Sequence, residues 1–265
     1  RSEGTLVEVL DHALTPMGSR LLKAWVTEPL KDVQSIDRRL DAVGELVSDT
    51  LARNDIGSSL KGTRDLERLI SKVMYGSANA RDLLAVRDSL ESVPEVREVL
   101  RGARSELLRE LGSGMKDVGD VAGLISRAIA PDPPVPLKEG GLIREGFDPA
   151  LDSLKAQARE GREWIASLEE TERARTGIKN LRLGFNNVFG YYLEVSKANA
   201  KRVPADYERM QTLTTGERYV TPALKEKEQA ILAAQERSCG LEYEAFVKVR
   251  DEVARHGKDI RETAR

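Results

Sequence analysis

Between residues 177 and 221, the apolar side chains of this chain stop following a helical repeat and begin to alternate. In the stretch Tyr191–Lys197, three of them, Tyr191, Leu193 and Val195, share one face, and the polar residues fall mostly on the other. A period of two is typical of a β-strand. Six of the ten Phe and Tyr residues lie in this window, and strands favour aromatic side chains. The glycines that would serve turns or bulges are Gly177, Gly184, Gly190 and Gly216. We therefore predict several short antiparallel strands.

The segments on either side of this window are predicted to be two long helices. The first, from about residue 149 to 175, has a seam of small and apolar residues at alternating spacings of three and four: Leu151, Leu154, Ala158, Gly161, Ile165 and Leu168. The second has the same spacing at Leu224, Ile231, Ala234, Ser238, Leu241 and Ala245. Such seams favour antiparallel pairing of the two helices. Because a helix of about 27 residues rises roughly 40 Å, the sequence predicts a stalk that carries a β tip away from the remaining chain.

The first half of the chain is predicted to be helical as well. Apolar residues recur at spacings of three and four in six ranges: 5–14, 19–25, 35–49, 63–73, 78–90 and 93–111. Thr15 is expected to cap a helix whose first residue is Pro16. Either Asp32 or Ser35 can cap the helix that follows. No internal repeat of solenoid length is present.

Two segments rich in glycine or proline interrupt this helical half. Gly112–Gly114 is expected to be a flexible joint, and residues 131–136 contain too many prolines for a helix or a central strand. Residues 112–119 and 131–141 are therefore candidate pivots, about which the helices could move as rigid rods. The alternative interpretation is that both are surface loops and nothing more.

The charge of the chain is balanced overall but not locally. Lys and Arg total 42 against 44 Asp and Glu, giving a net charge of −2, so the chain as a whole has no attraction for nucleic acid or for an anionic membrane. In residues 177–221 the balance is +3, from Lys179, Arg182, Lys197, Lys201, Arg202, Arg209 and Arg218 against Glu194, Asp206, Glu208 and Glu217. These cations could bind an anionic partner or could keep a small β module soluble, and charge alone does not separate the two interpretations.

No catalytic or metal-binding pattern is present in the sequence. His12 and His256 are far apart and have no cysteine beside them, so metal-ligand spacing is absent. Cys239 is the single cysteine, which excludes an internal disulfide and fits a reducing cytoplasm. The glycines and lysine of residues 112–116 lack the Gly-Lys-Ser/Thr ending of a nucleotide-binding P-loop. No apolar run approaches membrane-spanning length, so we expect no membrane partner, no metal and no enzyme activity in this chain.

Several stretches of the sequence, in order along the chain, resemble the DNA mismatch repair family MutS. They are TLVEVLDHALTPMGSRLLKAWVTEPL, DLERLISKV, EGGLIREGFDPALD, ERARTGIKNLRLGFNNVFGYYLEVSKAN and VPADYERMQTLTTGERYVTPALKEKE. The resemblance covers essentially the whole chain and is to the lever and clamp domains of that family. It implies a mainly α fold: a multi-helix lever body with a long antiparallel two-helix stalk that carries a small antiparallel β clamp subdomain. The implied division is lever in 1–176, clamp in 177–222 and returning stalk helix in 223–265.

The resemblance also implies what this chain does and what it lacks. Nothing in this sequence corresponds to the family's ATPase domain, which binds ATP and magnesium. Nothing corresponds to its mismatch-reading domain either. The chain would be a non-catalytic module whose clamp embraces double-stranded DNA through phosphate contacts and whose lever couples DNA binding to the ATPase. The full-length parent would be a homodimer that works with a MutL-like repair partner in the cytoplasm, at the nucleoid.

The residues expected to contact phosphate fall into two groups of cationic and short polar side chains. The first follows the YYLEV strand and the second surrounds the turn before Tyr219: Lys197, Asn199, Lys201 and Arg202, then Arg209, Thr214, Thr215 and Arg218. Many family members read roughly R-R-Q-T-L-K-N-A-E-R-Y in the second region, whereas this chain has Met210, Thr214 and Thr215 in place of an arginine, a lysine and an asparagine. We therefore expect weak DNA binding by the isolated fragment. The alternative is an interaction scaffold of a MutS homologue whose β tip binds protein.

Overall fold

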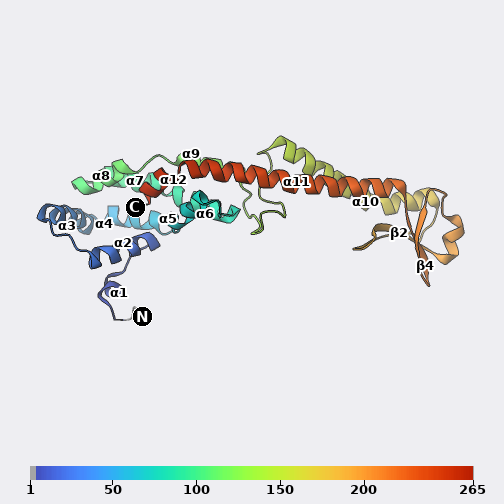
Figure 1. The fold of residues 1–265 in the computed structure, drawn as a ribbon, viewed down its shortest axis with the longest axis horizontal. Coiled ribbons are helices and arrows are strands. Elements are labelled where there is room, and N and C mark those ends of the chain that lie inside the picture. The colour runs from blue at the N-terminus through green and yellow to red at the C-terminus, as the bar shows by residue number, and fades with distance from the viewer. Residues whose placement is uncertain (1–3, 265) are drawn as a thin grey trace. The chain divides into compact units, whose positions relative to one another are not determined.

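The computed structural model describes residues 4–264 and confirms the predicted mainly α fold with a small antiparallel sheet. The chain forms two compact units (Figure 1). Unit 1 extends to Phe147 and resumes at Tyr243, and unit 2 comprises Asp148–Glu242. This division groups the stalk helices with the β tip, whereas the predicted boundaries at 176 and 223 follow the change of secondary structure. Within the described residues, no helix is both long and apolar enough to cross a membrane.

Unit 1 is built from short helices. They are α1 (Leu6–Leu10), α2 (Pro16–Thr27), α3 (Val33–Ser48), α4 (Thr50–Leu60), α5 (Leu66–Met74), α6 (Ala80–Glu91), α7 (Val93–Arg101), α8 (Glu106–Gly114), α9 (Gly119–Ala128) and α12 (Gly257–Thr263), with the last turns of α11 (Pro222–Arg255). The predicted caps are confirmed: the Thr15 hydroxyl accepts the Gly18 N–H with Pro16 as first helical residue, and Asp32 accepts the Ser35 N–H.

The core of unit 1 lies between α5, α6 and α9. Ile70, Leu83 and Ile125, one from each helix, are fully buried there. α6 packs on both α5 and α9, and α12 packs on α5. A second cluster, formed by Ala42, Val96, Leu100 and Leu108, joins α3 to the α7–α8 pair.

Three features of unit 1 differ from the prediction. Residues 93–111, expected as one helix, form α7 and α8 with a turn between them. Gly112–Gly114, expected as a flexible joint, is the last turn of α8. The structure also contains α4 and α9, which the apolar spacing did not identify. Gly112 is helical because it packs at the crossing of α7 and α8, where a Cβ atom would lie 2.8 Å from the Leu100 Cβ.

Unit 2 begins with the predicted stalk. α10 (Pro149–Thr176) starts at Asp148, whose carboxylate accepts the N–H groups of Ala150 and Leu151, and ends at Gly177 with a φ of 68°. α11 starts after Thr221, whose hydroxyl accepts the Leu224 N–H. Both predicted seams are confirmed, with every member buried or half-buried.

The pairs that meet across the stalk show that α10 and α11 are antiparallel. Near the start of α10, Lys155 forms a 2.6 Å ion pair with Glu242, late in α11. Further along α10, Gly161 contacts Ile231, which is earlier in α11. Gly161 is required at this crossing because a Cβ atom would lie 2.5 Å from the Ile231 Cγ1.

The β tip, residues 177–221, contains the four-stranded antiparallel sheet. Its elements are β1 (Arg182–Asn186), β2 (Gly190–Ser196), the 3-10 helix η1 (Lys197–Arg202), β3 (Glu208–Thr212) and β4 (Gly216–Val220), in the sheet order β1-β2-β4-β3. Leu193 and Val195 are fully buried on the face that was predicted to be apolar. They pack with Ile178, Leu181, Tyr219 and Leu224 in the core of unit 2.

Candidate nucleic-acid interface

The sheet brings the two predicted groups of phosphate-contacting residues to one end of the β tip. Ser196, the last residue of β2, is paired with Gly216, the first residue of β4. η1 therefore begins beside the β3–β4 turn, and the Lys197 N–H donates to the Thr215 carbonyl oxygen at 3.4 Å. We call this end of the tip, η1 together with residues 213–216, the cationic end.

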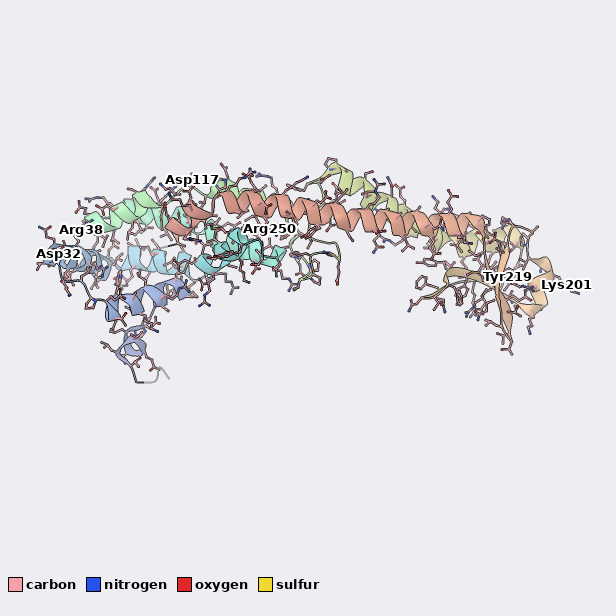
Figure 2. The ribbon with its side chains drawn as sticks, viewed as in Figure 1. Asp32, Arg38, Asp117, Lys201, Tyr219 and Arg250 are labelled. Atoms are coloured by element: carbon pink, nitrogen blue, oxygen red, sulfur yellow. The ribbon has the colours of Figure 1, made fainter. Side chains whose placement is uncertain are left out.

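Four of the predicted side chains are exposed at the cationic end and are not engaged elsewhere. These are Lys197, Lys201, Thr214 and Thr215. Within residues 4–264, none of these four side chains forms a hydrogen bond or an ion pair in the structure. Lys201 lies at the outer edge of the β tip, beyond the sheet (Figure 2). Two free ammonium groups with neighbouring hydroxyls can bind a phosphodiester backbone without recognising its sequence.

The other predicted residues of η1 are held by the chain itself. The Asn199 Nδ2 donates to Asn180 Oδ1 at 2.8 Å, and the Asn180 Nδ2 donates to the Ser196 Oγ at 2.8 Å. On the other side of η1, the Arg202 Nη2 donates to the Gly177 carbonyl oxygen at 3.3 Å. That carbonyl lies at the C-terminal end of α10, where a positive charge is favourable.

Arg218 is also engaged, on the open face of the sheet. Its Nε donates to the Glu194 carboxylate at 3.1 Å, its Nη1 donates to Gln211 at 3.0 Å, and its guanidinium lies 4.3 Å from the centre of the Tyr192 ring. The side chain is 23% exposed. Arg209 is freer, with 62% of its side chain exposed and a loose 3.7 Å contact to Glu217. Arg209 is therefore available to a partner, whereas Arg218 mainly holds the sheet together.

A polar network attaches the β tip to α10, and two of its members, Glu172 and Tyr207, are buried. The Tyr207 hydroxyl donates to the Glu172 carboxylate at 2.7 Å, and Arg175 bridges Glu172 and Asp206 at 2.8 and 3.0 Å. Burial, and then the hydrogen bond to Glu172, raise the pKa of Tyr207 far above its ordinary value. The hydrogen bonds to Glu172 and Asp206 raise the pKa of Arg175. With their pKa values raised, Tyr207 stays neutral and Arg175 stays charged at neutral pH, so both have a structural role in the network.

Two further carboxylates of the stalk accept backbone N–H groups of the sheet. Glu169 on α10 accepts the Leu183 N–H at 2.8 Å, and Glu228 on α11 accepts the Tyr191 N–H at 3.1 Å. Gly190 makes room for Glu228, because a Cβ atom there would lie 2.3 Å from the carboxylate. Both stalk helices therefore fix the position of the β1–β2 hairpin.

Two residues beside the cationic end, Lys179 and Asn180, were not among the sequence candidates. Asn180 is the link between α10 and η1 described above, and Lys179 precedes it with an exposed side chain. One sequence feature indicates that residues 179 and 180 lie near the stalk, because GIKN directly follows the predicted end of a helix. The spacing from residue 180 to residue 199 gave no indication that the two amides meet.

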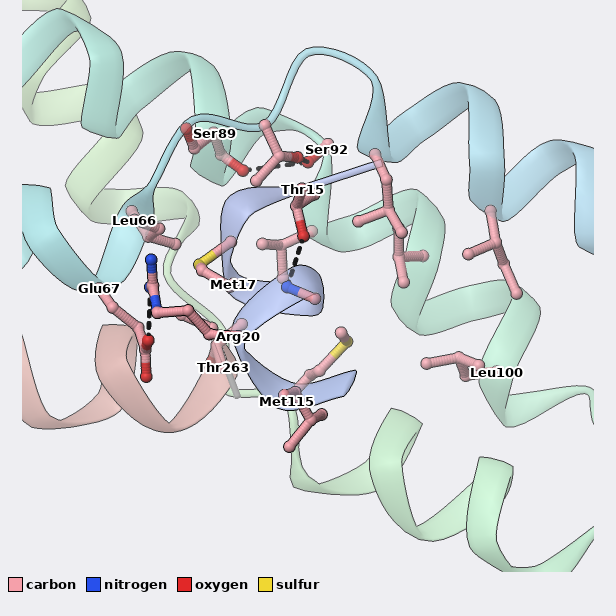
Figure 3. A pocket seen from close by; sticks show the side chains of 18 residues that line it. Thr15, Met17, Arg20, Leu66, Glu67, Ser89, Ser92, Leu100, Met115 and Thr263 are labelled. Atoms are coloured by element: carbon pink, nitrogen blue, oxygen red, sulfur yellow. Dashed lines mark hydrogen bonds and ion pairs between the residues drawn. The ribbon is translucent and has the colours of Figure 1, made fainter. Parts of the chain in front are cut away.

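Two other features of the described residues bear on what the chain could bind. No group of three or more His, Cys, Asp and Glu side chains there could hold a metal ion. Unit 1 contains a cavity of about 540 Å³ beside α2, lined mainly by apolar side chains such as Met17, Leu100 and Met115 (Figure 3). Its one cation, Arg20, is bound by Asp65 and Glu67 at 2.6 and 2.7 Å. This cavity does not resemble a phosphate site.

Comparison with known proteins gives one consistent result. The model of the family described as MutS domain III matches residues 1–265. The chain is 48% identical to the DNA mismatch repair protein MutS of Halothermothrix orenii over 264 residues, covering 100% of this chain and 30% of the relative. It is 49% identical to that of Symbiobacterium thermophilum over 262 residues, covering 99% and 30%. It is 45% identical to that of Methanosarcina barkeri over 266 residues, covering 99% and 30%. The chain therefore spans about a third of the length of these relatives.

Proposed function

This chain belongs to the MutS family, matching its domain III from end to end, and on that premise we propose that it is the lever and clamp module of a DNA mismatch repair ATPase. The β tip is the clamp and contacts duplex DNA through phosphates. The stalk and unit 1 are the lever, which couples DNA contact to an ATPase domain elsewhere in the parent protein. The parent acts as a homodimer with a MutL-like partner.

The observation that carries the DNA-binding proposal is the cationic end. Lys197 and Lys201 are free, while every acidic side chain of the β tip lies in an ion pair within the described structure. Any partner that approaches this end meets uncompensated positive charge with hydroxyl donors beside it. Phosphate contacts of this kind fix the position of a protein on duplex DNA and carry no base information.

Reversing the two free charges tests this proposal. In the full-length gene product, Lys197→Glu with Lys201→Glu is expected to weaken duplex binding about tenfold or more at low salt, because two phosphate contacts are replaced by repulsion. The matched control is Lys31→Glu with Lys61→Glu, which changes the net charge equally at exposed positions of unit 1. Fluorescence anisotropy with a labelled duplex measures both. Equal effects of the two pairs would contradict a local site.

For the 265-residue chain alone, we propose that duplex binding is weak. Two of its clamp positions, Met210 and Thr214, lack the charges of the commoner family pattern. Anisotropy at low salt is expected to show binding that disappears at physiological salt. Submicromolar affinity in physiological salt would overturn this part of the proposal.

The alternative, a β tip that binds protein, has one observation in its favour. The β1–β2 hairpin, at the opposite end of the sheet, exposes Phe185, Val188 and Phe189 by 57%, 79% and 55%. Asn186 holds the hairpin in shape, since its Oδ1 accepts the Val188 N–H at 2.8 Å. If this surface carries the function, Val188→Asp would abolish repair in cells, whereas the reversed lysines would not.

A further inference from the structure

Asn180 connects the cationic end to the stalk and has no charge of its own to offer to DNA. Its carboxamide makes two hydrogen bonds: the Nδ2 donates to Ser196 at 2.8 Å, and the Oδ1 accepts from Asn199 at 2.8 Å. Ser196 immediately precedes η1 and Asn199 is inside it. The Asn180 side chain is therefore hydrogen-bonded both to the residue before η1 and to the middle of η1, the 3-10 helix that carries Lys197 and Lys201.

The segment that contains Asn180 is itself fixed. It follows Gly177, whose N–H donates to the Arg173 carbonyl oxygen at 2.9 Å and closes the last turn of α10. Ile178 and Leu181 flank it and are fully buried in the core of unit 2. Arg202, at the other end of η1, returns to the Gly177 carbonyl oxygen. η1 is therefore hydrogen-bonded near both of its ends to residues 177–180, which follow α10. Because Ile178 and Leu181 are buried, this segment cannot move without opening the core.

We infer that Asn180 is a positioning residue that holds the lysines of η1 at a fixed separation and thereby gives the clamp its preference for duplex over single-stranded DNA. This inference rests on the proposed function. Duplex DNA presents phosphates at fixed spacing, so a rigid pair of cations gains from matching it. A flexible single strand can adapt to cations in any arrangement. Fixing η1 therefore favours the duplex and contributes little to single-strand affinity.

The test compares duplex and single-stranded DNA of the same sequence on the full-length gene product. Asn180→Ala is expected to weaken duplex binding about fivefold, the usual scale for a hydrogen-bonded positioning contact, and single-strand binding less than about twofold. Ser196→Ala removes one of the two hydrogen bonds of Asn180 and should shift the same ratio by a smaller factor. The matched control is Asn187→Ala, which removes an exposed amide from the hairpin at the opposite end of the sheet.

A double-mutant cycle separates positioning from a general loss of stability. If Asn180 acts through η1, its removal adds little once Lys197 and Lys201 are already alanine, and the fold-changes are not multiplicative. Multiplicative effects, or equal losses on duplex and single strand, would overturn the inference. Thermal unfolding of each variant identifies any that fails to fold, and Ser196→Ala then decides the outcome. If the lysine variants themselves leave duplex binding unchanged, the proposed function fails, which is a different result.

Discussion

Two tyrosines in the core of the β tip make its stability depend on pH. The Tyr207 and Tyr219 rings lie 5.8 Å apart, and their hydroxyls donate to Glu172 at 2.7 Å and Glu217 at 2.5 Å. Burial, together with the adjacent carboxylate, disfavours ionisation of each phenol. For Tyr219 these effects raise the pKa from 10 to about 12.

The pKa shift of Tyr219 predicts a loss of stability in alkali. A folded state that binds the phenol proton more tightly is favoured below pH 10, and this contribution disappears as the pH rises from 10 to about 12. The side chain is 6% exposed, so the loss should reach up to about 2 kcal/mol. Denaturant unfolding at pH 9, 10, 11 and 12 should show it as a difference between the wild type and Tyr219→Phe. Tyr75→Phe, at a side chain that is 88% exposed, serves as the control and should follow the wild type.

Residue types at the cationic end could be predicted from the sequence, but their availability could not. Lys201 and Arg218 are both cations in the same short window, yet one is free and the other is held by Glu194 and Gln211. The partners of Arg218 come from β2 and β3, so they are known only once the strand register is known. Asn180 was missed for the same reason. Neither contact can be predicted from the sequence, because each joins residues that only the tertiary fold brings together.

At the scale of the element, periodicity predicted the long helices and the alternating strand and missed the short elements. α10 and α11 have seams of many turns, so their signal is strong. α9 contains Gly119 and Gly123, and its buried residues Val121, Ala122, Ile125 and Ala128 share one helix face, with Ile125 fully buried against α6. α4 has few apolar positions, and Leu51 is 73% exposed. In both helices tertiary packing supplies the stability that intrinsic propensity does not.

The glycines of α8 give a sharp prediction because only one of them is packed. A Cβ atom on Gly112 would lie 2.9 Å from the Arg101 backbone nitrogen, which cannot move aside, whereas Gly114 has nothing within 4 Å. Gly112→Ala should therefore lower the free energy of unfolding of unit 1 by about 2 kcal/mol. Gly114→Ala should leave it unchanged or raise it slightly. Urea unfolding followed by circular dichroism measures both, and equal values would contradict the packing role of Gly112.

The stalk offers the same comparison in unit 2. Gly161→Ala places a methyl group against Ile231, and the resulting strain should exceed the gain in helix propensity, so that unit 2 loses about 1 kcal/mol. Gly240→Ala, at an α11 position with nothing within 4 Å, should instead gain about 1 kcal/mol. Opposite signs for the two substitutions are expected in thermal unfolding. A stabilised Gly161→Ala variant would mean that the helices can separate there without cost.

The loop of residues 131–141 is held more firmly than its proline content indicates. Arg81 on α6 donates to the Pro133 carbonyl oxygen at 2.8 Å and contacts the Asp132 carboxylate at 3.3 Å. Ile129 and Ile143 pair across the base of the loop. Its proposed role as a pivot therefore requires these contacts to open. Hydrogen exchange at the Ile129–Ile143 bridge, compared with the core of α6, tests whether they do.

For the whole molecule, the distribution of charge matters more than its sum. The net charge is −2, and at physiological salt the field of an exposed charge decays within about 8 Å. DNA therefore responds to the cations nearest to it. In the β tip the four carboxylates are all within ion pairs, which leaves the positive charge of Lys179, Arg182, Lys197, Lys201 and Arg202 without an acidic partner in the described structure. A chain that is acidic overall can thus present a positive surface on its β tip.

On the proposed function, adding cations to the β tip should change how its binding to DNA depends on salt. Met210 is 39% exposed at the bulge of β3, and Thr214 is exposed in the β3–β4 turn, within the cationic end. Met210→Arg with Thr214→Lys adds two phosphate contacts, so the slope of log affinity against log salt should steepen by about 1.8. The neutral pair Met210→Gln with Thr214→Gln has similar bulk and should leave the slope unchanged. Anisotropy titrations between about 50 and 200 mM salt measure the slopes. An unchanged slope in the charged variant would place the DNA elsewhere on the clamp.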